Sequence, residues 1–514
     1  MRRIGIGIDV GGTNTDAVLI EDGKVVGAVK APTSEDVTTG ILDSLKALGA
    51  TGVLKGKKID GVMIGTTHFI NAVVQRRHLT RVGALRLGMP ASASLPPFCD
   101  WPEDLANLVR GGVWMVEGGH EYDGRLFMPL DEAAVTKSAE EMKAKGLKSV
   151  AISAIFSPLD PTHEKRAAEL VAKVIPEAII TCSSDLGRIG LLERENAGLL
   201  NAALADLSRD TIAAFEKAIR DSGIAAPLFI TQNDGTVAEA SQARRLPVYS
   251  FASGATNSMR GAAYLSGLSD AMVIDVGGTT TDVGQLKNGF PREANSVVKV
   301  GGVRTLFRMP DLLSIGLGGG SHVQLDPLKV GLISVGYRLL RDGIAFGGKQ
   351  LTTTDVAIAA GVLTLGDRAK VAHLDAATCK KVFAEAARLS EEAIDRMKTE
   401  AGDVPLIAVG GGAFLIPEKL PGVSKVIHVE HGDCANAVGA AIAQVSGECD
   451  QIFKDMTRNE ALAAAQGIAN DRAVAAGAER KTLSTIESED MPLAYLPGNS
   501  VRVRVRVVGD VAGS

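Results

Sequence analysis

One pattern occurs twice in this chain, at 8–16 (IDVGGTNTD) and again at 274–282 (IDVGGTTTD). Each copy begins in an apolar, β-branched stretch that predicts a buried strand, and its glycine pair predicts a tight turn into a returning strand. The copies differ only in having Asn14 where the second has Thr280. Because they lie far apart in the chain, they indicate two related half-domains and exclude a short-period repeat.

The repeated pattern is suited to binding phosphate groups. Two glycines at a turn leave backbone N–H groups open to a phosphate, without a side chain in the way. We therefore expect the two hairpins to face each other and to hold the phosphates of a nucleotide between them. No G-x-x-x-x-G-K-[ST] sequence occurs, which excludes a Walker-type ATPase. The glycines predicted to bind the nucleotide are Gly11, Gly12, Gly277 and Gly278.

Acidic and hydroxyl side chains flank the glycines in both copies. Asp9 and Asp275 end the first strands, where a carboxylate can hold the hydration shell of Mg²⁺ or orient an attacking group near a γ-phosphate. They are the predicted metal ligands. A single copy could be an ordinary hairpin turn, but two matching copies favour a site for ATP and Mg²⁺. The predicted catalytic residues are Asp9, Asp275, Thr13 and Thr279, and the further predicted nucleotide contacts are Thr15, Asp16, Thr281 and Asp282.

The rest of the chain alternates strand and helix patterns, which is typical of an α/β protein. The predicted helical stretches are 36–49, 131–145, 161–174, 191–222, 433–445 and 455–480. The predicted strands include 62–64, 150–156, 248–251, 406–409 and 501–508.

Composition excludes several functional classes. The net charge of −5 argues against a general nucleic-acid-binding protein. No stretch approaches the ~18 apolar residues needed to span a bilayer, and Asp9 interrupts what would be the apolar part of a signal peptide. The five cysteines form no C-x-x-C pair, so they suggest neither a zinc site nor a redox motif. We expect a cytoplasmic protein with no nucleic-acid or membrane partner.

The paired hairpins and the segment 409–413 (VGGGA) resemble the superfamily of actin, sugar kinases and Hsp70 ATPases. This resemblance implies an α/β fold with two duplicated actin-like (ribonuclease H-like) half-domains flanking a nucleotide cleft. It also implies that Gly410, Gly411 and Gly412 approach the adenosine. The expected domains are 1–190 for the first half, 191–450 for the second, and 451–514 for a helical segment and terminal strand that pack on the body.

Four further segments are similar to the hydantoinase A/5-oxoprolinase family, and the resemblance covers residues from about 4 to 445. They are 65–72 (GTTHFINA), 193–202 (ERENAGLLNA), 313–321 (LSIGLGGGS) and 435–441 (ANAVGAA). This family uses ATP to phosphorylate an amide, or a ketone in its carboxylase branch. The activated intermediate is then hydrolysed or carboxylated, often with a partner subunit.

The resemblance implies an ATP-dependent amidohydrolase, or its ATPase subunit, that phosphorylates the carbonyl oxygen of a small cyclic amide and drives ring opening. It implies a homo- or hetero-oligomer with a second subunit of hydantoinase B or another hydrolase type. Three alternatives stay open: a small-molecule kinase, a ketone-carboxylase-type ATPase subunit, and an actin-like ATP switch that a partner protein senses.

The chain departs from the family pattern in three places. Asn14 stands where Phe is common, and 253–258 (SGATNS) stands where the family has S-G-P-A-A-G. Family members are also longer and carry a C-terminal domain that this sequence mostly lacks. The first two departures bear on substrate identity, and the third bears on the arrangement of partners.

Two segments supply the predicted substrate contacts. The first lies at a strand-to-helix junction, where an open α/β sheet places ligand groups. The second is a glycine-rich loop that could form an anion pocket or serve a structural role. His68 could likewise be a base or a structural residue. The predicted residues are Thr66, Thr67, His68 and Asn71 in the first segment, and Gly318, Gly319 and Ser321 in the second.

Other polar residues admit two interpretations. His428 and His431 could bind a metal or belong to a loop before a helix. The position of Cys434 at the start of that helix predicts a lowered thiol pKa.

The segment 231–235 could face the cleft or form a plain turn. Arg502, Arg504 and Arg506 share one face of the terminal strand. They predict an edge strand protected by charge, with a partner interface as the alternative.

Overall fold

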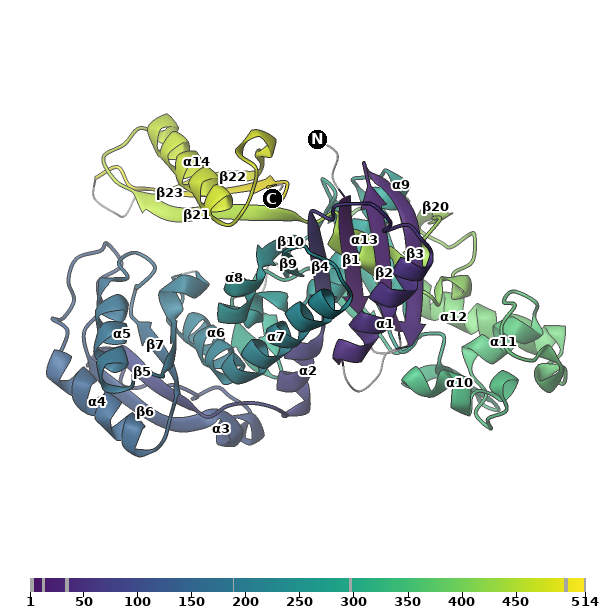
Figure 1. The fold of residues 1–514 in the computed structure, drawn as a ribbon, viewed down its shortest axis with the longest axis horizontal. Helices are drawn as coiled ribbons and strands as arrows, with labels where there is room; N and C mark the ends of the chain where they lie inside the picture. The colour runs from purple at the N-terminus through teal and green to yellow at the C-terminus, as the bar shows by residue number, and fades with distance from the viewer. Residues whose placement is uncertain are drawn as a thin grey trace.

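The computed structural model describes residues 4–11, 14–32, 37–187, 189–294, 298–493 and 498–512. These residues form a mixed α/β fold with several sheets (Figure 1), as the alternation of strands and helices predicts. Among the described residues, no helix combines the length and the apolar character needed to cross a bilayer.

The first sheet has the strand order β22-β23-β21-β10-β9-β4-β1-β2-β3. β1 forms an antiparallel hairpin with β2 and lies parallel to β4, which lies parallel to β9. The carboxyl ends of β1, β4 and β9 therefore meet at one edge of the sheet. The strands are β1 (Ile4–Val10), β2 (Asn14–Glu21), β3 (Lys24–Pro32), β4 (Gly61–Thr66), β9 (Leu228–Thr231), β10 (Thr236–Glu239), β21 (Gln444–Phe453), β22 (Ser484–Pro492) and β23 (Val501–Gly509).

The second sheet repeats the pairing pattern around the second hairpin. β11 pairs antiparallel with β12 and parallel with β19, which pairs parallel with β20. The registers match as well, because Asp9 lies opposite Asp16 and Asp275 lies opposite Asp282. The strands are β11 (Ala271–Val276), β12 (Thr281–Lys287), β13 (Phe290–Pro291), β16 (Leu312–Ile315), β19 (Val404–Val409) and β20 (Val423–His428).

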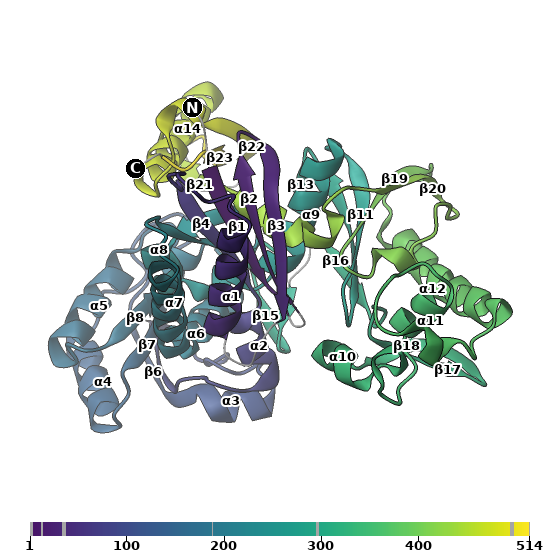
Figure 2. The ribbon, with the colours of Figure 1, turned by 45° about the vertical axis from the view of Figure 1, so that its right-hand side comes forward.

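Two helices lie between these sheets, α9 (Ser253–Ser266) and α13 (Ala435–Ala441). Figure 2 shows α9 between β3 and β11. The helices cross at two glycines, because a Cβ at Gly261 would overlap the carbonyl of Ala435 and a Cβ at Gly439 would overlap that of Asn257. This close approach brings the inner faces of both sheets to the same pair of helices.

A third sheet, in the order β6-β5-β7-β8, forms a separate body at the lower left of Figure 1. Residues 1–190, predicted as one half-domain, therefore contribute to two sheets. The strands are β5 (Val82–Met89), β6 (Arg110–Glu117), β7 (Ser149–Ala154) and β8 (Ile179–Cys182). The helices of this region are α3 (Glu103–Val109), α4 (Glu132–Ala144), α5 (Thr162–Val174) and α6 (Leu191–Ala203).

The last part of the chain extends the first sheet. The helix α14 (Arg458–Ala475) packs on β21 through a row of alanines, and a Cβ at Gly447 would overlap the carbonyl of Ala469. β23 lies between β21 and β22. The prediction that 501–508 is an edge strand is therefore wrong, since a second strand covers its other side.

Two local predictions also fail. The stretch 248–251 is a turn of 3-10 helix (Pro247–Ser250) that leads into α9, and Val248 and Phe251 are buried there without forming a strand. The stretch 191–222 is two helices, α6 and α7 (Ala205–Asp221), which meet at Leu204. A run of apolar residues predicts burial, but it does not show whether the backbone is a strand, a 3-10 turn or a helix.

The remaining elements complete the two halves. The helix α1 (Val37–Ala50) packs on the first sheet with α7, and α12 (Ala376–Met397) packs on the second. The others are α2 (His68–Gln75), α8 (Ala240–Arg245), β14 (Val298–Val300), β15 (Val303–Thr305), β17 (Ser321–Leu325), β18 (Leu328–Ser334), α10 (Leu339–Asp342) and α11 (Thr353–Ala359).

Candidate functional site

The first hairpin places a buried carboxylate at the end of β1. Asp9 is 7% exposed, and Asn436 of α13 donates a hydrogen bond from Nδ2 to its Oδ2 at 3.3 Å. Across the hairpin, Asp16 accepts a hydrogen bond at 3.0 Å from the Nζ of Lys30, which also donates to the backbone carbonyl of Asp433. The site therefore gathers residues from β1, β2, β3 and the turn before α13.

The two predicted metal ligands have raised pKa values. Burial raises the pKa of Asp9 to about 7, and the negative charges of Asp16 and Asp275 add to this effect. Burial raises the pKa of Asp275 to about 6, with a further contribution from Asp282. The facing arrangement of the two hairpins stays a prediction.

The site is short of positive charge and hydrogen-bond donors. The Oδ1 atoms of Asp16 and Asn257 are buried without a hydrogen-bond partner among the described residues. A hydrated Mg²⁺ would supply both charge and donors, so Asp9 and Asp275 fit this ion. Within the described ranges, no group of three or more His, Cys, Asp or Glu side chains is arranged to hold a metal by itself.

The turn glycines play a narrower part than the sequence suggests. The N–H of Gly11 donates to the carbonyl of Asn14 at 3.0 Å, and that of Gly277 donates to Thr280 at 2.9 Å. These two N–H groups close the turns and are therefore engaged within the hairpins. In the second hairpin the next residues are Gly278 and Thr279, and Thr279 is exposed. Gly12 and Thr13 lie outside the described residues.

The hydroxyl groups of Thr15 and Thr281, which were predicted to contact the nucleotide, lie inside the protein. Both residues are fully buried, and the Oγ1 of Thr281 donates to the carbonyl of Leu317 at 2.7 Å. Asp282 lies opposite Asp275 and accepts a hydrogen bond from Ser314. Direct contact of the two threonines with a nucleotide is therefore not supported by their positions.

The segment 410–412 lies directly against the second hairpin. Gly410 has φ +88°, and a Cβ there would overlap the Oδ1 of Asp275 and the carbonyl of Val276. The N–H of Gly412 donates to the same carbonyl at 2.7 Å. Gly411 between them is exposed, and a Cβ there would meet no atom within 4 Å. The predicted adenosine contact is therefore sterically open at Gly411.

The predicted substrate loop supports the second hairpin. The N–H of Gly319 donates to the carbonyl of Gly277 at 2.9 Å, and a Cβ at Gly318 would lie 2.7 Å from the same carbonyl oxygen. Ser321 is fully buried, and its Oγ accepts a hydrogen bond from the N–H of Gly318 at 2.8 Å. The polar groups of this loop are engaged within the protein, so its observed contacts are structural and its substrate role stays a prediction.

The strand-to-helix junction lies beside Asp9. Thr66 ends β4 opposite Val10 and accepts a hydrogen bond from the N–H of His68 at 3.1 Å. Asn71 donates to the Oγ1 of Thr67 at 3.2 Å. Burial lowers the pKa of His68, and the nearby His78 adds to this, so the imidazole is neutral at neutral pH. The substrate role of these residues also stays a prediction.

Three residues of the site were not predicted: Lys30, Asn257 and Asn436. Asn257 is fully buried on α9, and its Nδ2 donates to the Oγ1 of Thr231 at 3.0 Å. Asn257 and Asn436 both lie in segments already singled out, at 253–258 and 435–441, but neither could be assigned a contact. Lys30 carries no local signal, because its contact Asp433 is 403 residues away.

The weaker polar signals resolve as structural features. The thiol pKa of Cys434 is raised to about 12 by burial and by Asp433, so the predicted lowering is wrong. Among the described residues, no metal cluster includes His428 or His431. The segment 231–235 contains the turn that joins β9 to β10.

Comparison with known proteins identifies the family. The hydantoinase/oxoprolinase N-terminal region matches residues 5–175, and the hydantoinase/oxoprolinase domain matches residues 194–404. The chain belongs to the hydantoinase/oxoprolinase family.

Curated relatives include enzyme subunits that each match about two thirds of this hydantoinase/oxoprolinase chain. This chain is 27% identical over 392 residues to the caprolactamase subunit alpha of Pseudomonas jessenii. The match covers 70% of this chain and 55% of that protein. It is 26% identical over 393 residues to the acetophenone carboxylase gamma subunit of Aromatoleum aromaticum, covering 70% and 53%. The chain thus spans about half the length of the curated relatives it matches.

Two solved structures share the fold. A nucleotide-free acetone carboxylase structure aligns with a TM-score of 0.70 at 18% identity, covering 100% of this chain and 89% of that one. An ATP-dependent caprolactamase from Pseudomonas jessenii aligns with a TM-score of 0.76 at 20% identity, covering 99% and 87%. At these identities the likeness establishes the fold.

Proposed function

We propose that this chain is an ATP-hydrolysing enzyme, or the ATPase subunit of one, that phosphorylates the carbonyl oxygen of a cyclic amide and so drives ring opening. The observation that carries the proposal is the pair of hairpins with matched registers, in which Asp9 lies opposite Asp16 and Asp275 lies opposite Asp282. The shared strand pairing of the two sheets supports duplicated actin-like halves around a nucleotide. The relatives named above include an ATP-dependent caprolactamase, which supports the choice of amide.

The two hairpins would clamp the nucleotide from opposite sides. The amides of Gly278 and Thr279 would face the phosphates, while Gly411 would leave room for the adenosine. Asp9 and Asp275 would hold the water shell of Mg²⁺, which neutralises charge on the phosphates when it is bound. Their raised pKa values would then fall, because a nearby cation favours the ionised form.

The reaction follows from the poor reactivity of an amide carbonyl. The carbonyl oxygen would attack the γ-phosphorus, the bond to the β-phosphate oxygen would break, and ADP would leave. Water would then add to the activated carbon, and the carbon–nitrogen bond would break as the nitrogen takes up a proton. A second water would hydrolyse the resulting acyl phosphate to a carboxylate and phosphate. Thr66 and the neutral His68 lie beside Asp9, where they would contact the amide and orient it.

A ketone substrate is the second candidate. The chain is also similar to the acetophenone carboxylase gamma subunit and to the acetone carboxylase beta subunit of Xanthobacter autotrophicus, the latter at 25% identity over 375 residues. The same phosphorylation would apply to a ketone oxygen, and carboxylation would replace hydrolysis.

The test is an ATPase assay with a panel of hydantoins, lactams and ketones. It is run with the purified chain alone and with the product of the neighbouring gene. We expect a lactam or hydantoin to stimulate release of phosphate and to be opened in equal amount. Stimulation by a ketone only with bicarbonate present would select the carboxylase alternative.

Two other outcomes would reject ring opening. A stable phosphorylated product would identify a small-molecule kinase. Slow ATP turnover that responds to a partner protein and to no metabolite would identify an actin-like switch. The partner subunit, the oligomer and the cytoplasmic location remain part of the proposal.

A further inference from the structure

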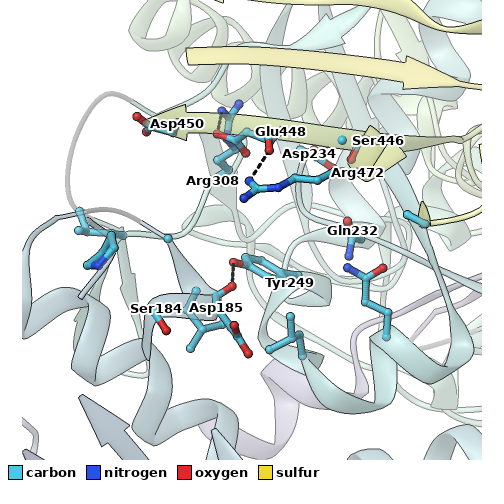
Figure 3. A pocket seen from close by; sticks show the side chains of 18 of the residues that line it. Ser184, Asp185, Gln232, Asp234, Tyr249, Arg308, Ser446, Glu448, Asp450 and Arg472 are labelled. Carbon is cyan, nitrogen blue, oxygen red and sulfur yellow. Dashed lines mark hydrogen bonds and ion pairs between the residues drawn. The ribbon is translucent and has the colours of Figure 1, made fainter. Parts of the chain in front are cut away.

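A large cavity lies apart from the two hairpins, between the C-terminal strands and the body that carries the third sheet. Its volume is about 830 Å³, which is within the range of small-molecule pockets. β21 and α14 form one wall, and the 3-10 turn Ser183–Leu186, α8 and Tyr249 form the other (Figure 3). The cavity therefore lies between parts of the chain that are distant in sequence.

The charges on the lining are balanced. Among the described residues that line the cavity, four carboxylates and four guanidinium groups balance each other in formal charge. This lining suits a ligand without net charge and does not suit a polyanion such as a nucleoside triphosphate. The charged residues are Asp185, Asp234, Glu448, Asp450, Arg245, Arg308, Arg472 and Arg502.

Several of these charges are already strongly paired with one another. Arg502 holds Asp450 through two hydrogen bonds of 2.8 and 2.6 Å. Arg308 donates to Glu448 at 2.6 Å and also pairs with two other glutamates. Such charge-assisted pairs fix the wall beside β21 and leave little capacity for a ligand.

Arg472 differs from these arginines. Its NH1 donates to the backbone carbonyl of Glu448 at 2.7 Å, and within the described ranges no carboxylate forms an ion pair with it. On the opposite wall, the carboxylate of Asp185 receives one hydrogen bond from the described residues, of 3.2 Å from Arg245, and its backbone carbonyl accepts one from the hydroxyl of Tyr249 at 3.3 Å. Figure 3 shows Arg472 on one side of the cavity and Asp185, Ser184 and Tyr249 on the other. The guanidinium of Arg472 and the carboxylate of Asp185 thus lie on opposite walls of the cavity, where both could bind a ligand.

We propose that this cavity binds a small zwitterion, that is, a molecule with one carboxylate and one ammonium group. The carboxylate binds the guanidinium of Arg472, and the ammonium group lies at Asp185 near the hydroxyl of Ser184. The amino acid released when a cyclic amide opens carries both groups. The identification of the ligand with this reaction product rests on the proposed function. The binding of a zwitterion in the cavity does not.

The cavity is joined to the candidate site by buried polar contacts. Asn233 lines the cavity, and its Oδ1 accepts a hydrogen bond from the N–H of Ala252 at 2.7 Å. The Oγ1 of Thr256 on α9 donates to the carbonyl of Asn233 at 2.9 Å. The next residue, Asn257, contacts Thr231, the last residue of β9. These contacts link the lining of the cavity to the end of β9, which lies beside β4 in the first sheet.

The test is isothermal titration of the full chain with unbranched ω-amino acids, from β-alanine to ε-aminocaproate. Caproate and hexylamine, which each carry one of the two charges, are titrated alongside. We expect one ω-amino acid per chain to bind, and both single-charge analogues to bind more weakly. Arg472→Gln and Asp185→Asn should each weaken binding by about tenfold or more, since each removes a charge-assisted hydrogen bond.

The matched control is Arg480→Gln. Arg480 pairs with Asp471 at 2.8 Å on the exposed surface and does not line the cavity. This variant should bind the probe as the wild type does, and the melting temperature of each variant checks its fold. The proposal is overturned if no member of the series binds, or if Arg472→Gln and Asp185→Asn both bind it with unchanged affinity. Neither result depends on whether the hairpin site turns over ATP.

Discussion

The two hairpins have matching sequences and registers, yet their surroundings differ. The backbone of the 316–321 loop and the segment 410–412 contact the second hairpin through hydrogen bonds and close packing. Amide and charged side chains contact the first, Asn436 at Asp9 and Lys30 at Asp16, whereas the hydroxyl of Ser314 contacts Asp282 in the second. Asp9 also has the higher pKa, about 7 against about 6 for Asp275. The two matching hairpins therefore differ in what contacts them, mainly backbone at the second and charged or amide side chains at the first.

This contrast has a chemical consequence. A hairpin held by backbone contacts is suited to fixing the nucleotide, while one surrounded by titratable side chains is suited to the reacting end. Thr66 and His68 adjoin the first hairpin and have no counterpart among the described contacts of the second. We therefore place the substrate on the Asp9 side and the adenosine on the Asp275 side.

The largest effect is expected from the two carboxylates themselves. Asp9→Asn and Asp275→Asn should each lower kcat for ATP hydrolysis by about 100-fold or more, because each removes charge that organises Mg²⁺ and the phosphates. Steady-state phosphate release measures this. Asp43→Asn on the exposed face of α1 is the control and should leave kcat unchanged. Near-normal activity in either hairpin variant would mean that the hairpins do not act together.

A pair of adjacent glycines tests the rigid support of the second hairpin. Gly410→Ala should destabilise the protein by about 2–4 kcal/mol, because it adds backbone strain and an overlap with Asp275. Gly411→Ala should change stability by less than about 0.5 kcal/mol, since its site is open, but it should weaken ATP binding. Urea unfolding and ATP titration measure the two effects. Equal destabilisation by both substitutions would contradict the tight fit at Gly410.

The pH dependence of stability should be dominated by the first hairpin. Asp9 has a folded pKa of about 7 against its ordinary 3.8, so between these values the folded state binds more protons than the unfolded state. Stability without ligand should therefore be highest below about pH 4 for this group and fall as pH rises through 7, by on the order of 4 kcal/mol.

Melting temperatures from pH 5 to pH 8 would measure this fall. Asp9→Asn should flatten most of it, and Asp275→Asn should flatten less, because the pKa of Asp275 is raised to about 6 only. Added Mg²⁺ and ATP should restore stability at high pH in the wild type. A wild-type stability that rises over this range would contradict the raised pKa of Asp9.

The smallest effect is expected at Asn436. Its hydrogen bond lowers the pKa of Asp9, so Asn436→Ala should move the acidic limb of the kcat/KM profile to higher pH by about 0.5–1 unit. Asn470→Ala on α14, far from both hairpins, is the matched control. A uniform loss of activity with no displacement of the profile would show that Asn436 acts only through the fold.

The sequence predicts the features that depend on local pattern. Both hairpins occur where expected, and the predicted helices at 36–49, 131–145 and 161–174 lie within about one residue of α1, α4 and α5. Turn glycines and helical periodicity act over a few residues, which is why one sequence suffices to find them.

Features that depend on distant contacts were not predictable. The position of β23 inside the sheet depends on β22, and the setting of Asp16 depends on Lys30 and on Asp433. The turn bond of Gly277 could not be foreseen either, because the sequence shows a glycine pair and not which N–H is free. These features are set by tertiary packing, which carries no signature at a single position.

The most direct test of the joint hairpin site is the stoichiometry of ATP binding with Mg²⁺, measured by isothermal titration. A shared clamp predicts one ATP per chain, and it predicts that Asp9→Ala and Asp275→Ala each weaken that single binding event by about tenfold or more. Two ATP per chain, or one binding event that is insensitive to either substitution, would contradict a site shared by the two hairpins.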